Sequence, residues 1–204
     1  MLPLLIFAAN PDVAHPHTGL LTPVTSKPAL AELSPGEEKS VEAGEVVLQQ
    51  VERDDGGVGV AVQYVEAPAA VVWKTILAYH RYTRWVKHVE SCEVYKTEGN
   101  KLWVDMQMST FGFDYGLYTV NTVRKDDGWM SWHLDYSRTS DVHDMTGYWL
   151  VTELDQDSTR LDYSSEVLVK NVPTVIAKFL TQSSLSDGTG WVKREAEKTW
   201  EKMQ

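Results

Sequence analysis

The sequence has almost no cysteine, fewer basic than acidic residues, and no long hydrophobic run. Its single cysteine, Cys92, excludes an intrachain disulfide and any metal site built from several cysteines. No catalytic signature surrounds this residue, so we expect a small buried apolar side chain. With 19 basic and 29 acidic residues the net charge is -10, and we identify no stretch as a basic patch. Binding to nucleic acid is therefore disfavoured.

The longest apolar run lies at the N-terminus and is too short to span a membrane. It covers about eight residues, against the ~20 that a membrane-spanning helix needs. Its length and its ending at Ala8-Ala9 resemble a secretory signal peptide, but the positively charged start of such a signal is missing. Either a signal that has lost its front or a hydrophobic stub fits this pattern. An exported and a cytoplasmic location are equally open.

The chain divides into an N-terminal segment and one domain. Five prolines interrupt residues 10–38 and leave little periodicity. We therefore predict a leader or Pro-rich segment over residues 1–40, without regular structure apart from a turn at residues 29–33. Residues 41–204 have the length of a single domain that can bury a core or enclose a cavity.

From Gly44 onward, apolar and polar residues alternate as they do in β-strands. Residues 45–66 hold two alternating runs joined by Asp54-Asp55-Gly56-Gly57, a strong hairpin signal because glycine accepts positive φ. Six further runs are separated by turn residues, which predicts an antiparallel meander. These runs are residues 89–95, 101–110, 115–124, 129–137, 146–154 and 159–169.

Short helical patterns separate the hairpin from the meander. Pro68 suits a first helical position, and the following turns place Val72 and Ile76 on one side. Tyr79, Tyr82 and Trp85 then recur at intervals of three. We expect these three aromatic residues to pack at the end of the domain rather than to contact a ligand.

A long helical segment closes the chain, from about residue 171 to about residue 202. Gly188 and Gly190 interrupt it, and each glycine costs about 1 kcal/mol in a helix interior. Residues 186–190 are therefore either a break or a soft point at which the helix could yield. A solvated break also accounts for Asp187.

About eight antiparallel strands and one long helix predict an α+β fold in which one sheet face packs on that helix. Alternation indicates which side chains share this face. A turn centred on Gln156-Asp157 would pair Leu150 with Tyr163 and Tyr148 with Ser165. The side chains expected to point inward, besides these four, are Leu102, Val104, Met106, Met108, Tyr118, Val120, Met130, Trp132, Leu134, Tyr136, Leu161 and Val167.

This expected inner face is rich in tyrosine, tryptophan and methionine, with hydroxyl groups interspersed. Core packing is one interpretation, since methionine fills irregular space and buried tyrosine needs a hydrogen-bond partner. An apolar wall with a few orienting hydroxyls is also typical of a small-molecule cavity. The sequence leaves both interpretations open.

Several short motifs carry a resemblance to a known family. They are Val65-Glu66-Ala67-Pro68 followed by Val71-Val72-Trp73, then Tyr82 and Trp85, Thr146-Gly147-Tyr148-Trp149, Thr159-Arg160-Leu161-Asp162-Tyr163, and Pro173. In this order, over residues 41–204, they resemble the START-like (SRPBCC) helix-grip superfamily, in particular its bacterial polyketide cyclase/dehydrase and coenzyme Q-binding branch.

The resemblance implies a curved antiparallel sheet of seven to eight strands wrapped around the C-terminal helix. Two short helices would close one end, and a deep hydrophobic cavity would lie between sheet and helix. Members bind lipids, sterols, quinones or polyketides, and only some are enzymes. One departure concerns the edge of the pocket, where many relatives have a proline and this chain has Val86-Lys87-His88-Val89.

The densest polar group, His133, Asp135, Asp141, His143 and Asp144, could in principle suit a divalent metal. The first two have outward parity on their strand, and the others fall in a loop. A solvated strand edge and turn explains the group better, with His143 a candidate gate residue. We expect no metal, no cofactor and no catalytic residue, because no pair of titratable groups faces the expected cavity.

We therefore hypothesise a non-catalytic protein that binds or transports a hydrophobic small molecule of lipid, sterol or quinone type. Transient contact with a membrane or with a donor or acceptor protein would accompany transport. The alternatives are an aromatase/cyclase-type enzyme for a polyketide-like substrate and an interaction module without ligand. The candidate ligand-binding residues are Leu102, Val104, Met106, Met108, Tyr118, Val120, Trp132, Leu134, Tyr148, Leu150, Tyr163, Ser165, Ile176, Phe179 and Leu180.

Overall fold

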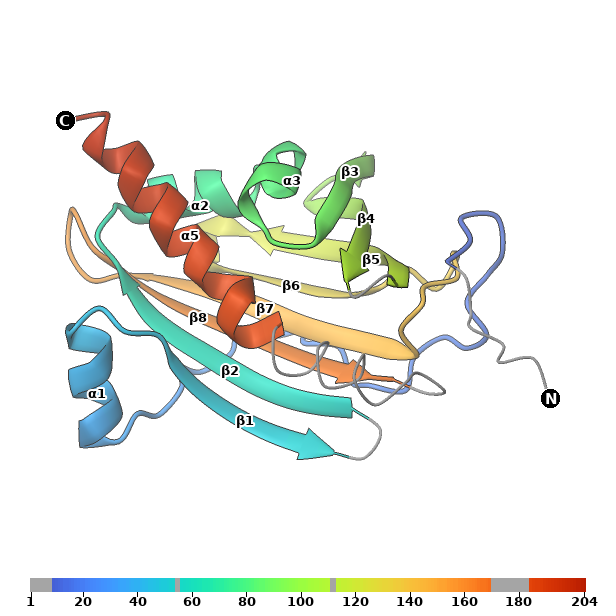
Figure 1. Ribbon diagram of the computed structural model, residues 1–204, viewed down its shortest axis with the longest axis horizontal. Coiled ribbons are helices and arrows are strands. Elements are labelled where there is room, and N and C mark those ends of the chain that lie inside the picture. Colours follow the sequence, from blue (N-terminus) through green and yellow to red (C-terminus); the bar gives the residue numbers. More distant parts are fainter. Residues whose placement is uncertain (1–8, 54–55, 111–112, 170–183) are drawn as a thin grey trace.

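The computed structural model describes residues 9–53, 56–110, 113–169 and 184–204. Within these ranges eight strands form one antiparallel sheet in the order β1-β2-β8-β7-β6-β5-β4-β3 (Figure 1). The strands are β1 (Val47–Arg53), β2 (Gly56–Val65), β3 (Val89–Glu98), β4 (Lys101–Thr110), β5 (Phe113–Arg124), β6 (Trp129–Leu134), β7 (Asp144–Glu153) and β8 (Thr159–Leu168). The predicted α+β class, first hairpin and meander are confirmed.

One long helix, α5 (Ser184–Glu201), lies across one face of the sheet, where it contacts α2, β2 and β8 (Figure 1). We call this the inner face and the opposite one the outer face. The shorter helices are α1 (Pro35–Glu42), α2 (Ala69–Ile76), η1 (Tyr79–Arg81), α3 (Tyr82–Trp85) and η2 (Lys125–Asp127). No helix in the described part of the chain is long and apolar enough to cross a membrane.

The segment between β2 and β3 explains why the short helices lie at one end of the sheet. β2 pairs with β8, whereas β3 forms the far edge, six strand positions away. At about 4.8 Å per strand this is a path of up to roughly 29 Å. α2, η1 and α3 cover that path, and the predicted α2 face is confirmed because Val72 and Ile76 are fully buried.

α5 continues without interruption through Gly188 and Gly190, so of the two predicted alternatives, a break or a soft point, the break is wrong. A side chain at Gly190 would meet no atom within 4 Å, and the helix meets no steric obstacle there. The earlier part of the predicted helix, with Pro173, lies outside the described residues.

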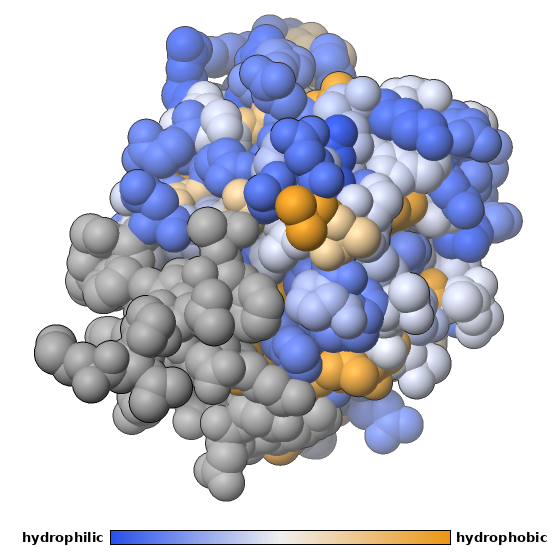
Figure 2. All heavy atoms as spheres, turned by 90° about the vertical axis from the view of Figure 1, so that its right-hand side faces the viewer, coloured by the Kyte–Doolittle hydropathy of each residue, from blue (hydrophilic) through white to orange (hydrophobic). Residues whose placement is uncertain are grey.

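The inner core joins the two helices to the central strands. Val72 and Ile76 of α2 and Trp191 of α5 pack in one apolar cluster with Trp132 and Leu161 of the sheet. Three further clusters lie under β3–β4, under β5 and β8, and beside α1. Apart from the atoms drawn in grey, the end of the molecule shown in Figure 2 is mostly hydrophilic, with hydrophobic residues in small separate areas.

Residues 9–34 follow the outer face, and the prediction of a segment without regular structure before residue 41 is partly wrong. Helix α1 begins there because Ser34 and Glu37 form a capping box and Pro35 occupies the first turn. The predicted turn at residues 29–33 is absent. Instead, the Ala31 N–H donates to Asp162 Oδ1 at 3.0 Å, and Arg160 Nη2 donates to the Ala31 carbonyl at 2.7 Å.

The register of β4 with β5 corrects one prediction about the inner face. Met106 pairs with Leu117, and Thr110 pairs with Phe113, so only two residues separate these strands. Directly paired residues lie on the same face of an antiparallel sheet. Leu117 therefore shares the inner face with Met106, whereas Tyr118 and Val120 point outward.

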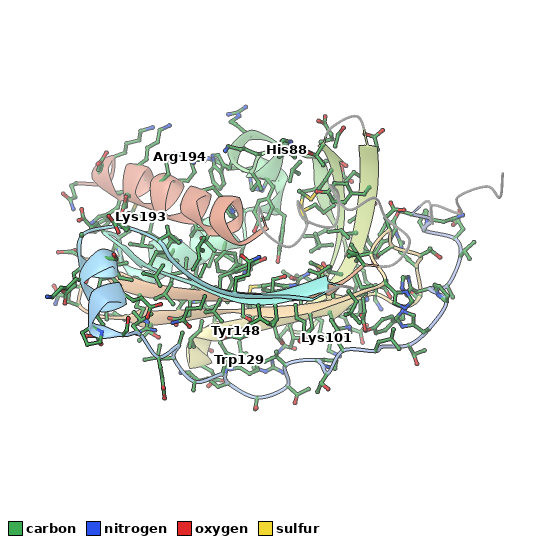
Figure 3. All side chains as sticks on the ribbon, turned by 60° about the horizontal axis from the view of Figure 1, so that its bottom comes forward. His88, Lys101, Trp129, Tyr148, Lys193 and Arg194 are labelled. Atoms are coloured by element: carbon green, nitrogen blue, oxygen red, sulfur yellow. The ribbon has the colours of Figure 1, made fainter. Side chains whose placement is uncertain are left out.

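The same one-residue difference corrects the prediction for β7 and β8. Trp149 pairs with Tyr163 and Leu150 with Asp162, one position away from the predicted pairing. A slip of one residue moves a whole strand pattern to the opposite face. Tyr148 and Leu150 therefore point outward, and Figure 3 shows Tyr148 on the side of the N-terminal segment, away from Lys193 and Arg194 of α5.

Candidate ligand-binding cavity

An apolar cavity of about 180 Å³ lies on the inner face of the sheet. Residues of β3–β8, of the β6–β7 connection, of the α2–β3 segment and of α5 form its walls. Its lining comprises Tyr79, Tyr82, Val86, Lys87, His88, Cys92, Val104, Met106, Met108, Tyr115, Leu117, Thr119, Asn121, Trp132, Val142, Met145, Trp149, Tyr163, Val167 and Trp191.

Three aromatic rings form the sheet wall of the cavity. The ring of Tyr163 lies 5.3 Å from that of Trp132, in a stacked arrangement, and 4.4 Å from that of Trp149. Gly147 makes this packing possible, because a Cβ atom there would lie 2.3 Å from both Trp132 Cζ2 and the Ser164 carbonyl oxygen. The rings thus form a closely packed wall that any ligand would contact edge or face.

Two phenol groups of the lining have no hydrogen-bond partner for their hydroxyl within the described structure. Tyr79 is 6% exposed and Tyr115 is 7% exposed, and burial raises the pKa of both phenols. Both are therefore neutral at ordinary pH. Such buried hydroxyls are costly unless they gain a partner, which a ligand with a carbonyl or hydroxyl group would supply.

Among the other polar groups of the lining, Asn121 and Thr119 are bonded to each other and Cys92 is weakly reactive. Asn121 Nδ2 donates to Thr119 Oγ1 at 2.9 Å. Cys92 is 4% exposed, and burial raises the pKa of its thiol to about 12. A thiol held protonated is a poor nucleophile, so the prediction of a small buried side chain is confirmed.

The α2–β3 segment forms the rim of the cavity. Tyr79 and Tyr82 line the cavity, so the prediction that they only pack at its end is wrong. Trp85 lies farther out, with its ring 6.1 Å from that of Trp191. His88 has a φ of 67°, a left-handed conformation that non-glycine residues rarely adopt. Residues 80–88 are also locally basic, contrary to the prediction that no stretch of the chain is a basic patch.

The structure places the fifteen candidate ligand-binding residues in four groups. Val104, Met106, Met108, Trp132 and Tyr163 line the cavity. Leu102 and Leu134 belong to adjacent apolar clusters, and Ser165 is buried on the inner face of β8 beside the lining residue Val167. Tyr118, Val120, Tyr148 and Leu150 lie on the outer face, which corrects their assignment. Ile176, Phe179 and Leu180 lie outside the described residues.

Sequence reasoning missed one side of β5 and of β7. Leu117, Thr119 and Asn121 line the cavity from β5, and Met145 and Trp149 line it from β7. The two-residue spacing between β4 and β5 could have revealed the first set, because it pairs Met106 with Leu117. Alternation alone could not, since Tyr118 and Val120 on the outer face are also buried.

The sequence predicted that the polar group of residues 133–144 forms a solvated strand edge and turn. This prediction is wrong. Asp135 is 7% exposed and Asp144 is fully buried. Asp144 accepts hydrogen bonds from the N–H groups of Leu20 and Leu21 and from the Tyr136 hydroxyl. Burial alone would raise the pKa of Asp144, but these bonds outweigh it and lower the pKa below its usual value.

The histidines of this region also hold the N-terminal segment. The Nε2 atoms of His15 and His17 lie 2.9 and 2.6 Å from the carbonyl oxygen of His143. The chain pairs Asn10 with Thr139 in a short antiparallel bridge beside them. Among the described residues no group of three or more histidine, cysteine or acidic side chains is arranged to hold a metal ion.

An antiparallel sheet bent around a long C-terminal helix, with an apolar cavity between them, defines the helix-grip fold of the START superfamily. The green strands β3–β5 turn away from the rest of the sheet in Figure 3. The family model described as polyketide cyclase / dehydrase and lipid transport matches residues 65–187, more than half of the chain. The chain belongs to this family.

Solved structures agree with the fold. Human STARD10 has a TM-score of 0.61 at 11% identity, over 78% of this chain and 73% of that one. TTHA0849 from Thermus thermophilus has a TM-score of 0.60 at 15% identity, over 69% and 97%. The Zhui aromatase/cyclase from Streptomyces sp. R1128 has a TM-score of 0.56 at 16% identity, over 74% and 95%. No curated protein sequence matches the chain significantly.

Proposed function

We propose that this protein binds a hydrophobic small molecule of lipid, sterol or quinone type in the cavity and carries it without transforming it. The observation that carries the proposal is the lining itself: methionine and aromatic side chains surround two buried phenol hydroxyls that have no described partner. The apolar walls suit a hydrophobic body, and the hydroxyls suit a carbonyl or hydroxyl group on it. The family includes lipid-transport proteins, which is consistent with this role.

The size of the cavity adds a condition. Its volume of about 180 Å³ is below the ~300–1,000 Å³ of typical ligand pockets. A lipid, sterol or quinone is larger, so binding requires the walls to separate. The α2–β3 segment and α5 pack on the sheet through an apolar cluster, and such packing is non-directional and permits a shift. A shift of α5 would also break its three hydrogen bonds to β2 and Glu66.

A cavity-filling substitution tests the proposal. Met106→Trp places an indole inside the cavity, whereas Glu93→Trp adds the same ring at an exposed position of the neighbouring strand β3. We expect Met106→Trp to weaken binding of a fluorescent fatty acid, a sterol or a quinone by about tenfold or more, because it removes space. Glu93→Trp should bind like the parent protein.

Mass spectrometry of solvent extracts from the denatured protein should also identify a co-purified hydrophobic molecule. The proposal fails if the extract holds no ligand above background and none of the three probes binds. Equal affinities of Met106→Trp and Glu93→Trp would place the binding site elsewhere.

A cyclase activity is the competing proposal, since the family also includes polyketide cyclases and dehydrases. The described lining contains no carboxylate, and burial raises the pKa of its tyrosines, that of Tyr163 to about 12. Apart from His88 and Lys87 at the rim, proton transfer at neutral pH would thus have to use poor acids and bases. Turnover of a polyketide-like substrate that is lost in Tyr79→Phe or Tyr115→Phe would contradict the carrier proposal and support a cyclase.

A further inference from the structure

The rim of the cavity has a charge opposite to that of the protein. We call residues 79–88, which comprise η1, α3 and the turn before β3, the cap segment. It contains Arg81, Arg84 and Lys87 together with His80 and His88, and no acidic residue, in a chain of net charge -10. All five basic side chains are exposed. The acidic residues of the chain therefore lie outside this segment.

The charges of the two arginines are not neutralised by the described carboxylates. The ion pairs in the described part of the chain join Lys96 to Glu98, Arg160 to Asp162, Lys193 to Glu197 and Arg194 to Glu195. Arg81 instead lies over the Trp85 ring, at 5.3 Å from its centroid. Arg84 is likewise absent from these pairs, so both cations remain available to an external anion.

The cap segment combines these cations with aromatic and apolar groups. Trp85 and Val86 are half-buried, and Tyr82 and Val86 line the cavity from the same segment. Tryptophan is favoured at the boundary between water and lipid, since its ring is apolar and its N–H is polar. Thus one short segment presents cations outward, an aromatic ring at its edge and apolar side chains to the cavity.

We propose that the cap segment docks on the surface of a lipid bilayer that carries anionic headgroups. The inference rests on the proposed function, because docking would bring the cavity rim next to the layer from which a hydrophobic ligand is taken. Cations close to an anionic leaflet attract it, whereas the acidic remainder of the chain is repelled and faces away. Figure 3 shows His88 and Arg194 on one side of the molecule and Lys101 on the other.

A bilayer fits these observations better than a nucleic acid or an acidic protein. A nucleic acid would extend beyond the cap segment, and its phosphates would be repelled by the negative charge of the rest of the protein. An acidic protein would pair with the cations but would give no role to the cavity rim beside them. A bilayer meets the cations with its headgroups and the rim with its apolar interior.

Vesicle flotation tests the proposal without any cavity ligand. The full chain is mixed with phosphatidylcholine vesicles that either contain or lack phosphatidylglycerol. The test variant carries Arg81→Gln, Arg84→Gln and Lys87→Gln. The control carries Lys39→Gln, Lys101→Gln and Lys125→Gln, three exposed lysines outside the cap segment, and has the same net charge.

We expect the parent and the control variant to float with the anionic vesicles only. Each cation near the surface strengthens binding about fivefold, so the triple cap variant should bind about 100-fold more weakly. High salt should release the parent protein, since exposed charges are screened. This salt measurement needs no variant and therefore holds even if the cap variant folds poorly, which thermal unfolding of both variants reveals.

Three results would overturn the inference: no binding to anionic vesicles, equal binding to neutral ones, or equal losses in the cap and control variants. Retention by an acidic protein without vesicle binding would also overturn it and point to a protein partner. Ligand binding in solution without vesicle binding would remove the docking surface and leave the proposed function intact. Vesicle binding by a protein that takes up no ligand would support the docking surface and contradict the proposed function.

Discussion

The two faces of the sheet are both covered, but with a different balance of apolar packing and hydrogen bonding. On the inner face, α2 and α5 pack in an apolar cluster beside the cavity, and three hydrogen bonds also join α5 to β2 and Glu66. On the outer face, residues 9–34 are held through directional hydrogen bonds to the buried carboxylates Asp144 and Asp162. Hydrogen bonds of this kind fix a position, whereas apolar packing tolerates a sliding contact.

This difference suggests how one sheet can be rigid and adaptable at once. The N-terminal segment holds the outer face in place, so the strands that carry the cavity wall have a fixed backing. Under the proposed function, the helices of the inner face must then move against that wall when a ligand enters. The outer face is thus expected to determine stability, and the inner face to determine binding.

The largest expected effect is the loss of the Asp144 carboxylate. Asp144→Ala removes the acceptor for two N–H groups of the N-terminal segment and for the Tyr136 hydroxyl. Hydrogen bonds to a charged group each contribute about 1.5–3 kcal/mol, but removing the carboxylate also removes the cost of burying it, so we expect a net loss of about 3–4 kcal/mol in the free energy of unfolding. Urea denaturation at neutral pH measures it, and Asp155→Ala at an exposed turn is the control.

The lowered pKa of Asp144 predicts the sign of a pH dependence. The folded protein holds this carboxylate ionised more strongly than the unfolded chain, so its contribution is present above the usual aspartate pKa of 3.8 and is lost as the pH falls through the folded pKa. The Asp144→Ala variant should lack this part of the acid sensitivity. If the free energy of unfolding depends on acid pH in the same way in parent and variant, Asp144 does not stabilise the outer face.

A smaller effect is expected on the inner face, from Gly147→Ala. The added Cβ would overlap the Trp132 ring and the Ser164 carbonyl, so the wall must shift. Overpacking of this kind costs about 1–3 kcal/mol. Calorimetry should show a lower Tm together with altered ligand affinity, whereas Gly190→Ala, which meets no atom within 4 Å, should not lower Tm. A loss of stability with unchanged ligand affinity would show that the ligand does not bind against this wall.

The smallest and most local effect concerns His15. Its Nδ1 accepts a hydrogen bond from the Ser140 N–H, and its Nε2 contacts the His143 carbonyl. Burial, opposed by that carbonyl, lowers the pKa of His15, and neighbouring His17 lowers it while Asp144 raises it. A group with a lowered histidine pKa stabilises the fold above its usual value of 6.5 and loses this contribution as the pH falls toward the folded pKa.

Hydrogen exchange of residues 10–21 should therefore accelerate as the pH falls below about 6.5, after correction for the intrinsic exchange rate. His15→Gln should flatten this dependence, and His80→Gln, at an exposed position, should not change it. Acceleration that persists in His15→Gln would show that His15 does not cause the pH dependence. A segment whose protection does not change with pH would show that the outer face is held by the aspartates alone.

Much of the fold could be predicted because its signals are local. The β1–β2 hairpin, the alternation along β4 and the buried side of α2 each follow from residues within one element and its neighbours. The same holds for Val104, Met106 and Met108, whose alternation survives in the cavity wall. Helix α1 could also have been predicted, since Ser34 and Glu37 form its capping box.

Other parts could not be predicted because they depend on contacts between distant segments. His143 and Asp144 were interpreted as a solvated turn, yet they hold residues more than 120 positions earlier in the chain. Tyr118 and Leu150 are buried on the outer face, and their apolar character made that side of their strands resemble the inner side.

By itself, then, the sequence determined the class of fold, the first hairpin, the antiparallel meander and the apolar character of the face that β4 presents. Only the tertiary structure decided which side of β5 and β7 lines the cavity and what the polar residues 133–144 do. The physical reason is the two-residue period of the pleat: a shift of one residue in a turn exchanges the two faces, and here both faces are buried. Alternation shows that a strand has two sides, and contacts with distant residues decide which side is which.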